Sequence, residues 1–410
     1  RNKSDFLNCR RTVEDSNGEQ LNDLLWDRQL AVSERLGLNL KEDYPEAVGG
    51  STDAVMNAVK AGDNSYQLVT LRNVHSVQLA SQGVAYNWAK IKNIDLEKNY
   101  WYDTINEDLR FAGKMYFAAG AYNLSSFDFT HLILINKELV SNFHLENPYE
   151  LVKNGKWTFD KFAEFGLAAT RDLNSDGQMT LEDAFGYMAS AKQISPNFWI
   201  SADTKGIERD ENGKPVFTMA TDEKFLGVLT RVYSIMWDDG IWYNDNTMQD
   251  IPDTAIEAFS ENRALMMDST LYTVKRLREM EADFGMLPYP KYTEDQDVYY
   301  SRIEGCELPI IPLANSQDSA DMAGAFLEAM ASFSYKNTIP TYYEVYLKTR
   351  NSRDKESSEI MDLIFENRIF DLADTVWCDS IRDTFVRTLF GSNNRNFVST
   401  FKKSTNTVQK

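Results

Sequence analysis

The segment DLNSDGQMTLED, residues 172–183, has the residue types and the spacing of a calcium-binding loop. Calcium takes about six to eight oxygen ligands from a chain that turns sharply. Side-chain oxygens recur at every second position here, and Gly177 follows where the turn needs a positive φ. The predicted ligands of this structural calcium ion are Asp172, Asn174, Asp176, the backbone carbonyl of Gln178, Thr180 (directly or through water) and Asp183.

The last position of the loop departs from the usual pattern. It is Asp183 where the longer Glu is usual, and Glu182 stands next to it as a substitute. An ordinary Asn/Asp/Gly turn without a metal is the alternative interpretation. Calcium sensors work as pairs of loops flanked by helices, whereas the following AFGYMAS is a poor second helix. The sequence therefore predicts a structural clamp and not a sensor.

Other chemistry finds little support in the motifs. The sequence has no GxSxG, no P-loop, no HExxH and no GxGxxG followed by an acid. Cys9, Cys306 and Cys378 are far apart and form neither a CxxC pair nor a zinc pattern. We expect core or free thiols, with one disulfide as an alternative whose pairing the sequence does not fix.

Composition narrows the class of protein. A chain of 410 residues is too long for one ordinary core, so two lobes are expected, and 43% hydrophobic residues indicate a fully folded protein. The net charge of −19 repels phosphate backbones and argues against a nucleic-acid partner. There is no apolar run of bilayer length and no cleavable signal at RNKSDFLNCRR. Both a cytoplasmic protein and a mature exported protein fit these observations.

Strands and helices alternate along the chain, which predicts α/β lobes. Unbroken apolar runs indicate strands buried on both faces of a mainly parallel sheet. An amphipathic helix ends at Gly37, and two others begin at the capping residues Thr158 and Thr221, the latter ending near Gly240. Asn212-Gly213 is a hairpin signal. The predicted strands are residues 4–11, 66–71, 131–136, 284–289 and 306–313.

The region around the calcium loop resembles extracellular solute-binding proteins of carbohydrate ABC transporters, of the family 1 type found in Gram-positive bacteria. The stretch DFTHLILINKELVSNFHLENPYELVKNGKWTFDKFAEFG carries the resemblance. A strand ends in NKEL, and NPYELV and NGKWT follow, before the DLNSDG loop and AFGY. The matching residues are Asn136, Lys137, Leu139, Asn147, Pro148, Tyr149, Gly155, Lys156, Trp157 and Thr158.

Three further blocks are similar to the same family. They are LNDLLWDRQLAVSERLGLNL near the start, AFSENRALMMDSTLYTVKRLREMEADFGMLPYPKYTEDQDVYY, and IPTYYEVYLKTRNSRDKESSEIMDLIFENRIFDL. Together the blocks cover most of the chain in the family's order.

The resemblance implies a two-lobe α/β fold of the periplasmic-binding-protein-like type II class, a clamshell with hinge crossovers. The N-terminal lobe would hold residues 1–125 and 290–335, and the C-terminal lobe residues 126–289 and 336–410. The crossings would lie near residues 125–129, at 287–290 and near Tyr335. The lobes of this family close over a ligand by hinge motion.

The resemblance also implies the function. Such a protein captures an oligosaccharide between its lobes, delivers it to ABC permease membrane subunits and has no catalytic centre. We expect a monomer outside the cell, anchored by a lipid to the outer face of the cytoplasmic membrane. The anchoring cysteine of the family lies upstream of the first strand, so Cys9 need not be that residue.

Sugar rings stack on aromatic side chains, and their hydroxyls pair with carboxylates, amides and guanidinium groups. Suitable residues follow the predicted strands, where open α/β sheets place their ligands. Trp237 and Trp242 flank a helix end rich in Asp and Gly. The predicted ligand-binding residues are Glu14, Asp15, Asn17, Arg72, Asn73, His75, Asp128, Trp199, Trp237, Asp238, Trp242, Tyr272, Arg302, Glu304 and Tyr342.

Two other classes of function stay open. A glycosidase would need two carboxylates facing each other, and the many acidic residues do not exclude this, although no motif marks such a pair. A calcium-responsive adhesion or signalling module is the second class. A binding protein that presents its ligand to a sensor kinase and not to a permease is a variant of the transport function. The aromatic content of 12% favours an oligosaccharide over a charged amino acid as ligand.

Overall fold

The computed structural model describes residues 12–42, 50–110, 113–244, 252–274, 277, 283–342 and 355–408. The chain divides into two compact units. Unit 1 comprises Arg1–Asp128, Asn212–Lys214 and Gly305–Tyr346, and unit 2 comprises Phe129–Glu211, Pro215–Glu304 and Leu347–Lys410. The strand predicted at residues 4–11 and Cys9 lie outside the described residues.

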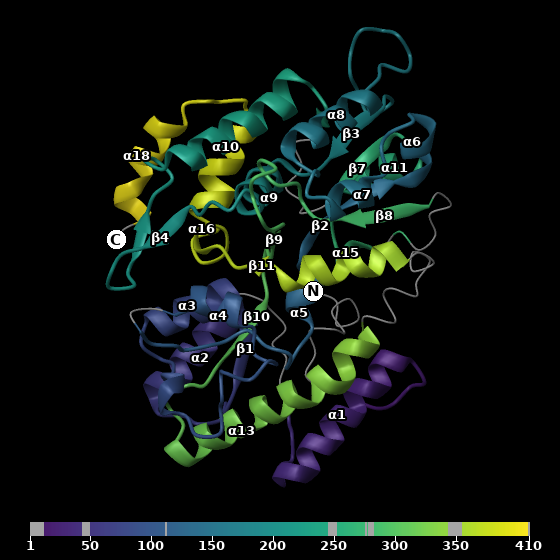
Figure 1. Ribbon diagram of the computed structural model, residues 1–410. Coiled ribbons are helices and arrows are strands. Elements are labelled where there is room, and N and C mark those ends of the chain that lie inside the picture. The colour runs from purple at the N-terminus through teal and green to yellow at the C-terminus, as the bar shows by residue number, and fades with distance from the viewer. Residues whose placement is uncertain are drawn as a thin grey trace. The chain divides into compact units, whose positions relative to one another are not determined.

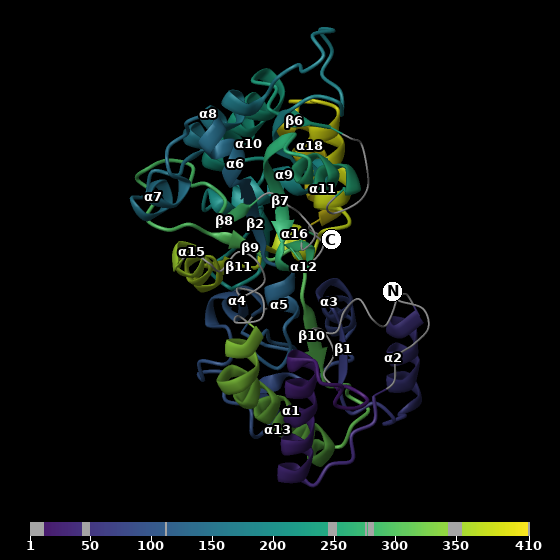
Figure 2. The same cartoon turned by 90° about the vertical axis from the view of Figure 1, so that its right-hand side faces the viewer.

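Unit 1 is built on a short antiparallel ladder between two strands far apart in the sequence. Strand β1 pairs with β10 in a register that places Val69 opposite Ile310 and Arg72 opposite Glu307. Helix α1 packs along α13, and the two views in Figures 1 and 2 show them side by side. The elements are α1 (Gln20–Leu36), α2 (Gly50–Ala61), β1 (Val69–Arg72), α3 (Asn73–Ser81), a 3-10 turn (Trp88–Lys90), α4 (Asp103–Asp108), α5 (Ser125–Asp128), β10 (Glu307–Ile310), α13 (Gln317–Phe333) and a π-helical turn (Ser334–Thr338).

Helix α1 ends as its sequence predicts, and an acidic side chain caps its start. The Glu19 carboxylate accepts the backbone N–H groups of Leu21 and Asn22, which lack partners inside the helix. Gly37 ends the helix in the left-handed conformation, with φ of 63°.

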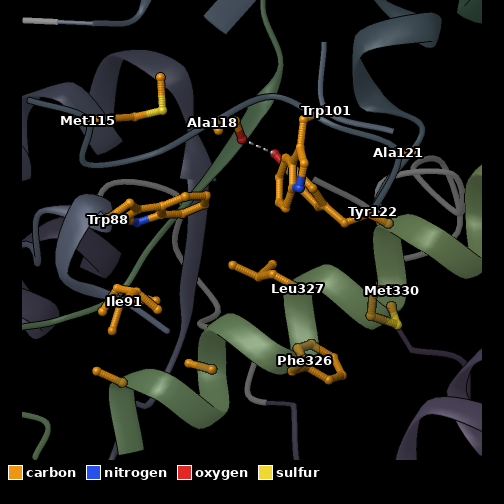
Figure 3. Packing of buried hydrophobic residues seen from close by; sticks show 14 of the residues in the cluster. Trp88, Ile91, Trp101, Met115, Ala118, Ala121, Tyr122, Phe326, Leu327 and Met330 are labelled. Carbon is orange, nitrogen blue, oxygen red and sulfur yellow. Dashed lines mark hydrogen bonds between the residues drawn. The ribbon is translucent and has the colours of Figure 1, made fainter. Parts of the chain in front are cut away.

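Aromatic packing forms the core of unit 1. The rings of Trp88 and Trp101 meet edge to face with centroids 5.9 Å apart, and Tyr122 lies 5.9 Å from Trp101. Figure 3 shows these rings around Leu327 of α13, with the Tyr122 hydroxyl donating to the Ala118 carbonyl at 3.2 Å. Such rings bury a large apolar area, which is the main stabilising term of a core.

Unit 2 contains a five-stranded sheet in the order β6-β3-β7-β2-β8. Helix α8 packs on β3 and β7, α11 on β7 and α15 on β8. The elements are β2 (His131–Asn136), α6 (Lys137–Asn142), α7 (Pro148–Lys153), α8 (Phe159–Ala169), β3 (Phe185–Met188), α9 (Ala191–Ser201), β4 (Ile207–Arg209), β5 (Pro215–Phe217), α10 (Glu223–Tyr233), a π-helical turn (Ser234–Asp238), β6 (Trp242–Tyr243), α11 (Asp253–Ser260), β7 (Ala264–Thr270), α12 (Leu271–Val274), β8 (Phe284–Leu287), β9 (Ser301–Arg302), α15 (Lys355–Glu366), β11 (Arg368–Ile369), α16 (Leu372–Thr375), the π-helical turn η6 (Ile381–Val386), α17 (Arg387–Gly391) and α18 (Phe397–Val408).

The sheet of unit 2 is mixed, so the expectation of a mainly parallel sheet was wrong. Strand β2 is antiparallel to both neighbours, β7 and β8, whereas β3 is parallel to β6 and β7. All six residues of β2 are buried, as in a central strand of a parallel sheet. An apolar run reports burial on both faces and does not report strand direction, which explains the error.

Local capping in unit 2 agrees with the sequence at one helix and differs by one residue at another. Thr158 caps α8 through the N–H of Lys161. Helix α10 is capped by Asp222 through the N–H of Phe225, and Thr221, the predicted cap, precedes it. Asn212-Gly213 forms the turn between β4 and β5, which pair as the predicted hairpin.

The units divide at other residues than predicted, except at the first crossing. The chain passes from unit 1 to unit 2 between Asp128 and Phe129, within the predicted interval. Residues 290–304 belong to unit 2, because Lys291 pairs with the backbone of Trp157 and Phe159 and β9 pairs with β11. The described residues 336–342 belong to unit 1 and not to the second lobe, because the chain continues there from α13 through the π-helical turn.

No helix among the described residues is long and apolar enough to cross a membrane. Cys306 of unit 1 and Cys378 of unit 2 are both buried, at 3% exposure.

Candidate functional site

A buried charged cluster is the most unusual chemical feature of unit 2. It consists of His131, Asp268, Arg302, Glu304, Asp374 and Arg382, each at most 6% exposed. Lys, Arg, Asp and Glu are seldom fully buried unless they are paired, so the cluster depends on its own contacts.

Five segments position these side chains. His131 is the first residue of β2 and Asp268 lies in the neighbouring β7, where the register places Thr270 opposite His131. Arg302 ends β9, and Glu304 follows two residues later. Asp374 lies in α16 and Arg382 in η6.

Arg302 is the centre of the cluster. Its Nε and Nη2 donate to the two Asp374 oxygens at 2.6 and 2.8 Å, which is the bidentate geometry of a strong ion pair. Its Nη1 donates to Asn197 Oδ1 at 3.0 Å and to Gln193 Oε1. Arg382 Nη1 lies 3.3 Å from both Asp374 and Glu304, so it joins the two carboxylates.

Asp268 gathers donors from three other elements. Its Oδ1 lies 2.9 Å from His131 Nδ1, 3.1 Å from Asn197 Nδ2 and 2.6 Å from the Tyr289 hydroxyl. The hydroxyls of Tyr289 and Tyr187 are 2.7 Å apart, which extends the network to β3.

The ionisation of the cluster follows from its charges. Burial alone would raise the pKa of Glu304, but Arg382, His131 and Arg302 outweigh it and hold that pKa well below its usual range. Burial alone would lower the pKa of His131, but Asp268 and Glu304 raise it above its ordinary value. The ion pairs are thus present around neutral pH.

Arg302 and Glu304 were predicted as ligand-binding residues, and the structure places both in this core. Arg302 is 1% exposed and directs all its nitrogens at protein groups. The cluster holds the chain where it leaves unit 2, because Glu304 is the last residue before Gly305 of unit 1.

Asp128 and Tyr342 of unit 1 form a second buried pair. The Tyr342 hydroxyl donates to Asp128 Oδ1, and each residue is 1% exposed. The rings of Tyr102 and Tyr342 each lie 6.0 Å from Phe127. The pair therefore packs the end of unit 1 beside the first crossing.

Arg72, Asn73 and His75 lie at the end of β1, as the sequence predicts for residues after a strand. Asn73 is buried, and its N–H donates to the Cys306 carbonyl at 2.9 Å. Arg72 is exposed and His75 is half-buried. Arg72 is thus the most exposed residue of this group.

The loop with Glu14, Asp15 and Asn17 is exposed and is organised by Asp23, a residue that the sequence reasoning missed. Asp23 Oδ1 accepts the Ser16 hydroxyl and the N–H groups of Asn17 and Gly18 at 2.8 to 3.1 Å. The Ser16 hydrogen bond is the largest reason that the pKa of Asp23 is lowered. An acid in the first turn of a predicted helix was the available signal.

The predicted aromatic platforms differ in exposure. Trp199 is fully buried against Phe225, with centroids 5.4 Å apart. Trp242 is 6% exposed, and its indole N–H donates to the Ala189 carbonyl. Trp237 is half-buried and stands edge to face with Trp242 at 5.4 Å.

Two further predicted residues lie near helix ends of unit 2. Asp238 is exposed and pairs with Arg395 at 2.6 Å. Tyr272 is half-buried on α12. Among the described aromatic residues predicted to bind ligand, Trp237 and Tyr272 are the half-buried ones, so they are the better candidates for ring stacking.

The 172–183 loop folds around its own acidic residues. Asp172 accepts the N–H groups of Ser175 and Gly177 at 2.7 and 2.8 Å, and Asp176 accepts that of Gln178 at 2.7 Å. Ser175 and Gly177 both have positive φ, of 61° and 79°. Asp183 accepts the N–H groups of Leu173 and Thr180, so it closes the loop. These hydrogen bonds lower the pKa of Asp183, and the one from the Thr180 N–H has the largest effect.

The members of the charged cluster that sequence reasoning missed are His131, Asp268, Asp374 and Arg382. Asp268 carried the clearest signal, because it is the one charge in the apolar stretch ALMMDST. A charge inside a strand that is otherwise apolar predicts a buried partner.

The comparisons with known proteins concern the whole chain. A scan against protein-family models found no match, and a search of curated proteins found no similar sequence. The solved structures include many similar folds. A sugar transporter from Rhizobium etli in an open conformation has a TM-score of 0.65 at 13% identity, covering 97% of this chain and 98% of that chain.

Two other solved structures are similar over almost their full length. A cyclo/maltodextrin-binding protein complexed with maltotetraose has a TM-score of 0.63 at 15% identity, covering 95% of this chain and 94% of that chain. UgpB from Mycobacterium tuberculosis, in complex with glycerophosphocholine, has a TM-score of 0.60 at 14% identity and 94% coverage of both chains. The chain therefore has the α/β fold of the type II periplasmic-binding-protein-like solute-binding proteins.

Proposed function

We propose that this protein is the substrate-binding component of an ABC importer and that its ligand is an oligosaccharide. The observation that carries the proposal is the similarity of fold over 94–97% of the chain to the transport and binding proteins above. The cyclo/maltodextrin-binding protein was solved with maltotetraose, and another similar structure, the maltose/maltodextrin-binding domain MalE from Bdellovibrio bacteriovorus, was solved with maltotriose. The resemblance of residues 128–187 to the same class of protein supports the proposal independently of the fold comparison.

The proposal includes the place and partners of the protein. It acts outside the cell, tethered by a lipid, as a monomer that delivers its ligand to permease subunits. It binds without catalysis, and neither a glycosidase nor a sensor function is favoured by any specific contact among the described residues.

Isothermal titration calorimetry with a panel of linear and cyclic oligosaccharides tests the proposal. We expect saturable binding with unchanged sugar recovered afterwards, as analysed by chromatography. Hydrolysis of the bound sugar would show an enzyme. Binding of peptides with no response to any glycan would show that the ligand class is wrong.

Arg72 and Trp237 are the residues through which the ligand proposal is best tested. Arg72 is exposed at a strand end, and Trp237 has part of its ring exposed. We expect Arg72→Ala and Trp237→Ala to weaken glycan binding about tenfold or more, because each would remove a hydrogen-bonding or stacking partner. Arg35→Ala, at an exposed arginine in the last turn of α1, is the matched control and should bind as the wild type does.

We also propose that the 172–183 loop binds one calcium ion. The supporting observations are its oxygen-rich side chains and the tight turn at Ser175 and Gly177. The ligands would be Asp172, Asn174, Asp176, the Gln178 carbonyl, Thr180 and Asp183. The ion would add positive charge that offsets the acidic side chains and would brace the loop.

Calorimetric titration of chelator-treated protein with calcium tests this second proposal. Calcium at about one hundred times its Kd would stabilise the fold by roughly 2.7 kcal/mol. Asp172→Asn should abolish the binding, whereas Asp295→Asn, at an exposed acid in another loop, should leave it intact. A loop that takes up no calcium in the wild type would be an ordinary turn.

A further inference from the structure

His131 stands between two carboxylates inside the charged cluster, and its hydrogen bonds limit its protonation state. Its Nδ1 lies 2.9 Å from Asp268 Oδ1, and its Nε2 lies 3.5 Å from Glu304 Oε2. Arg302 Nη1 is also 3.4 Å from Nε2. A guanidinium nitrogen at this position carries two hydrogens, and Gln193 and Asn197 accept them both. Arg302 Nη1 therefore has three acceptors for two hydrogens, and the imidazole is the most distant of the three.

Neither neutral tautomer satisfies this environment. With the proton on Nδ1, the lone pair of Nε2 faces the Glu304 carboxylate. With the proton on Nε2, the lone pair of Nδ1 faces Asp268 Oδ1, which already accepts from Tyr289 and Asn197. Either arrangement buries a repulsive contact, which is costly in a medium of low polarity.

The charges of the cluster lead to the same conclusion. The cluster contains two guanidinium groups, those of Arg302 and Arg382, and three buried carboxylates, those of Asp268, Glu304 and Asp374. A positive charge on His131 brings the buried charges into balance. Asp383, which pairs with Arg382 at 2.7 Å, lies at the edge of the cluster with its side chain 34% exposed.

We propose that His131 is a doubly protonated imidazolium that bridges Asp268 and Glu304. Its charged contact with Glu304 joins two of the segments by which the chain enters and leaves unit 2, and this contact, called the latch below, is lost when His131 loses its proton. These segments run side by side. Thr130 and Ile303 form a bridge, and the Glu304 N–H donates to the Phe129 carbonyl at 3.2 Å. His131 and Glu304 thus add a charged side-chain contact to the backbone contact that joins Phe129 to Glu304.

The direction of the pH effect follows from linkage. The pKa of His131 is raised in the folded protein, so its contribution to stability is fully present below the unfolded value of 6.5. That contribution is lost as the pH rises through the folded pKa. Two carboxylates favour the charge on His131, those of Asp268 from β7 and of Glu304, whereas Arg302 from β9 opposes it. Arg382 from η6 pairs with Glu304. The Tyr289 hydroxyl donates to Asp268 and contacts the Tyr187 hydroxyl, and burial raises the pKa of both tyrosines.

Long-range proton–nitrogen NMR of the imidazole rings tests the proposal directly, because the chain has only three histidines. His75→Gln and His144→Gln assign the signals. We expect both ring nitrogens of His131 to remain protonated at pH values above 6.5, where a free imidazole loses its proton, and Glu304→Gln to move this titration to lower pH. A neutral tautomer of His131 at pH about 6 in the wild type would overturn the proposal.

Denaturant unfolding at pH values from about 5 to 9 tests the latch. We divide the unfolding constant of His131→Gln by that of the wild type. This ratio should be largest in acid, where His131 is protonated, and should fall as the pH rises through the folded pKa of His131. The total fall should be about tenfold for each unit by which the folded pKa exceeds the unfolded one. His144→Gln, at an exposed site outside the cluster, is the control and should track the wild type. A ratio that does not change with pH would show that His131 serves packing alone, and a variant that fails to fold leaves the NMR result to decide.

Discussion

The two units stabilise the residues beside the chain crossings by different interactions. In unit 1 the Tyr342 hydroxyl donates a hydrogen bond to the buried Asp128 carboxylate, and this unit also has a large aromatic core. Ser125 Oγ accepts the Glu307 N–H there at 2.9 Å. In unit 2 the corresponding interaction is a cluster of buried ion pairs centred on Arg302. Unit 1 thus depends mainly on apolar area, which is insensitive to pH, and unit 2 depends in addition on charges that titrate.

This difference has a thermodynamic consequence. Buried ions gain little overall, because desolvation offsets their attraction, but removal of one partner leaves an uncompensated charge. An apolar core loses stability in proportion to the area and cavity that a substitution creates. Unit 2 should therefore be the more sensitive to single charge changes, and unit 1 the more sensitive to truncation of its rings and leucines.

Asp374→Asn should give the largest effect. It removes the carboxylate that both Arg302 and Arg382 contact, and the free energy of unfolding should fall by about 3–5 kcal/mol. Asp238→Asn breaks an exposed pair with Arg395 and should cost at most about 1 kcal/mol. Urea unfolding of both variants measures the contrast, and equal losses would mean that the buried cluster has no special weight.

Leu327→Ala should destabilise unit 1 by about 2–5 kcal/mol, because this fully buried side chain fills the space between the aromatic rings. The loss should be the same from about pH 5 to 9, since none of the atoms removed titrates. Leu30→Ala, at a leucine of α1 that is 41% exposed, is the control and should change stability by about 0.5 kcal/mol or less. A strong pH dependence in Leu327→Ala would contradict the assignment of unit 1 to apolar packing.

Tyr342→Phe should cost about 1.5–3 kcal/mol, the range for a hydrogen bond to a charged group. The double variant with Asp128→Asn should lose less than the two single losses added together, because the two side chains share one contact. Additive losses in denaturant unfolding would show that the hydroxyl and the carboxylate do not act as a pair.

Thr158→Ala should have the smallest effect, about 1 kcal/mol, because it removes only the cap of α8. Thr158→Ser keeps a hydroxyl at the cap and should restore most of the loss. This pair separates local helix stability from the long-range contacts of unit 2. Melting temperatures by circular dichroism provide the measurement, and a loss as large as that of Asp374→Asn would contradict the separation.

The sequence predicted those parts of the fold that depend on neighbours along the chain. The end of α1 at Gly37, the cap at Thr158 and the buried strand 131–136 all follow from local conformational preference or from apolar pattern. The calcium loop and the sugar ligand remain predictions at the level of motif and resemblance.

The sequence could not predict what depends on distant pairing. Arg302 and Glu304 follow a strand and are polar, which suits a ligand contact and a buried ion pair equally well. The partner Asp374 lies 72 residues further along the chain, and no local pattern connects it to Arg302. For the same reason the antiparallel pairing of β2 with β7 was missed, since strand direction depends on topology and not on the residues of one strand.

Calorimetric titration of the purified protein with oligosaccharides, maltotetraose and its cyclic relatives among them, tests the central claim most directly. The account predicts that at least one glycan binds saturably at a stoichiometry of about one per chain and is recovered intact. A protein that binds no glycan in the panel but binds peptides, or that cleaves the glycan it binds, would contradict the account.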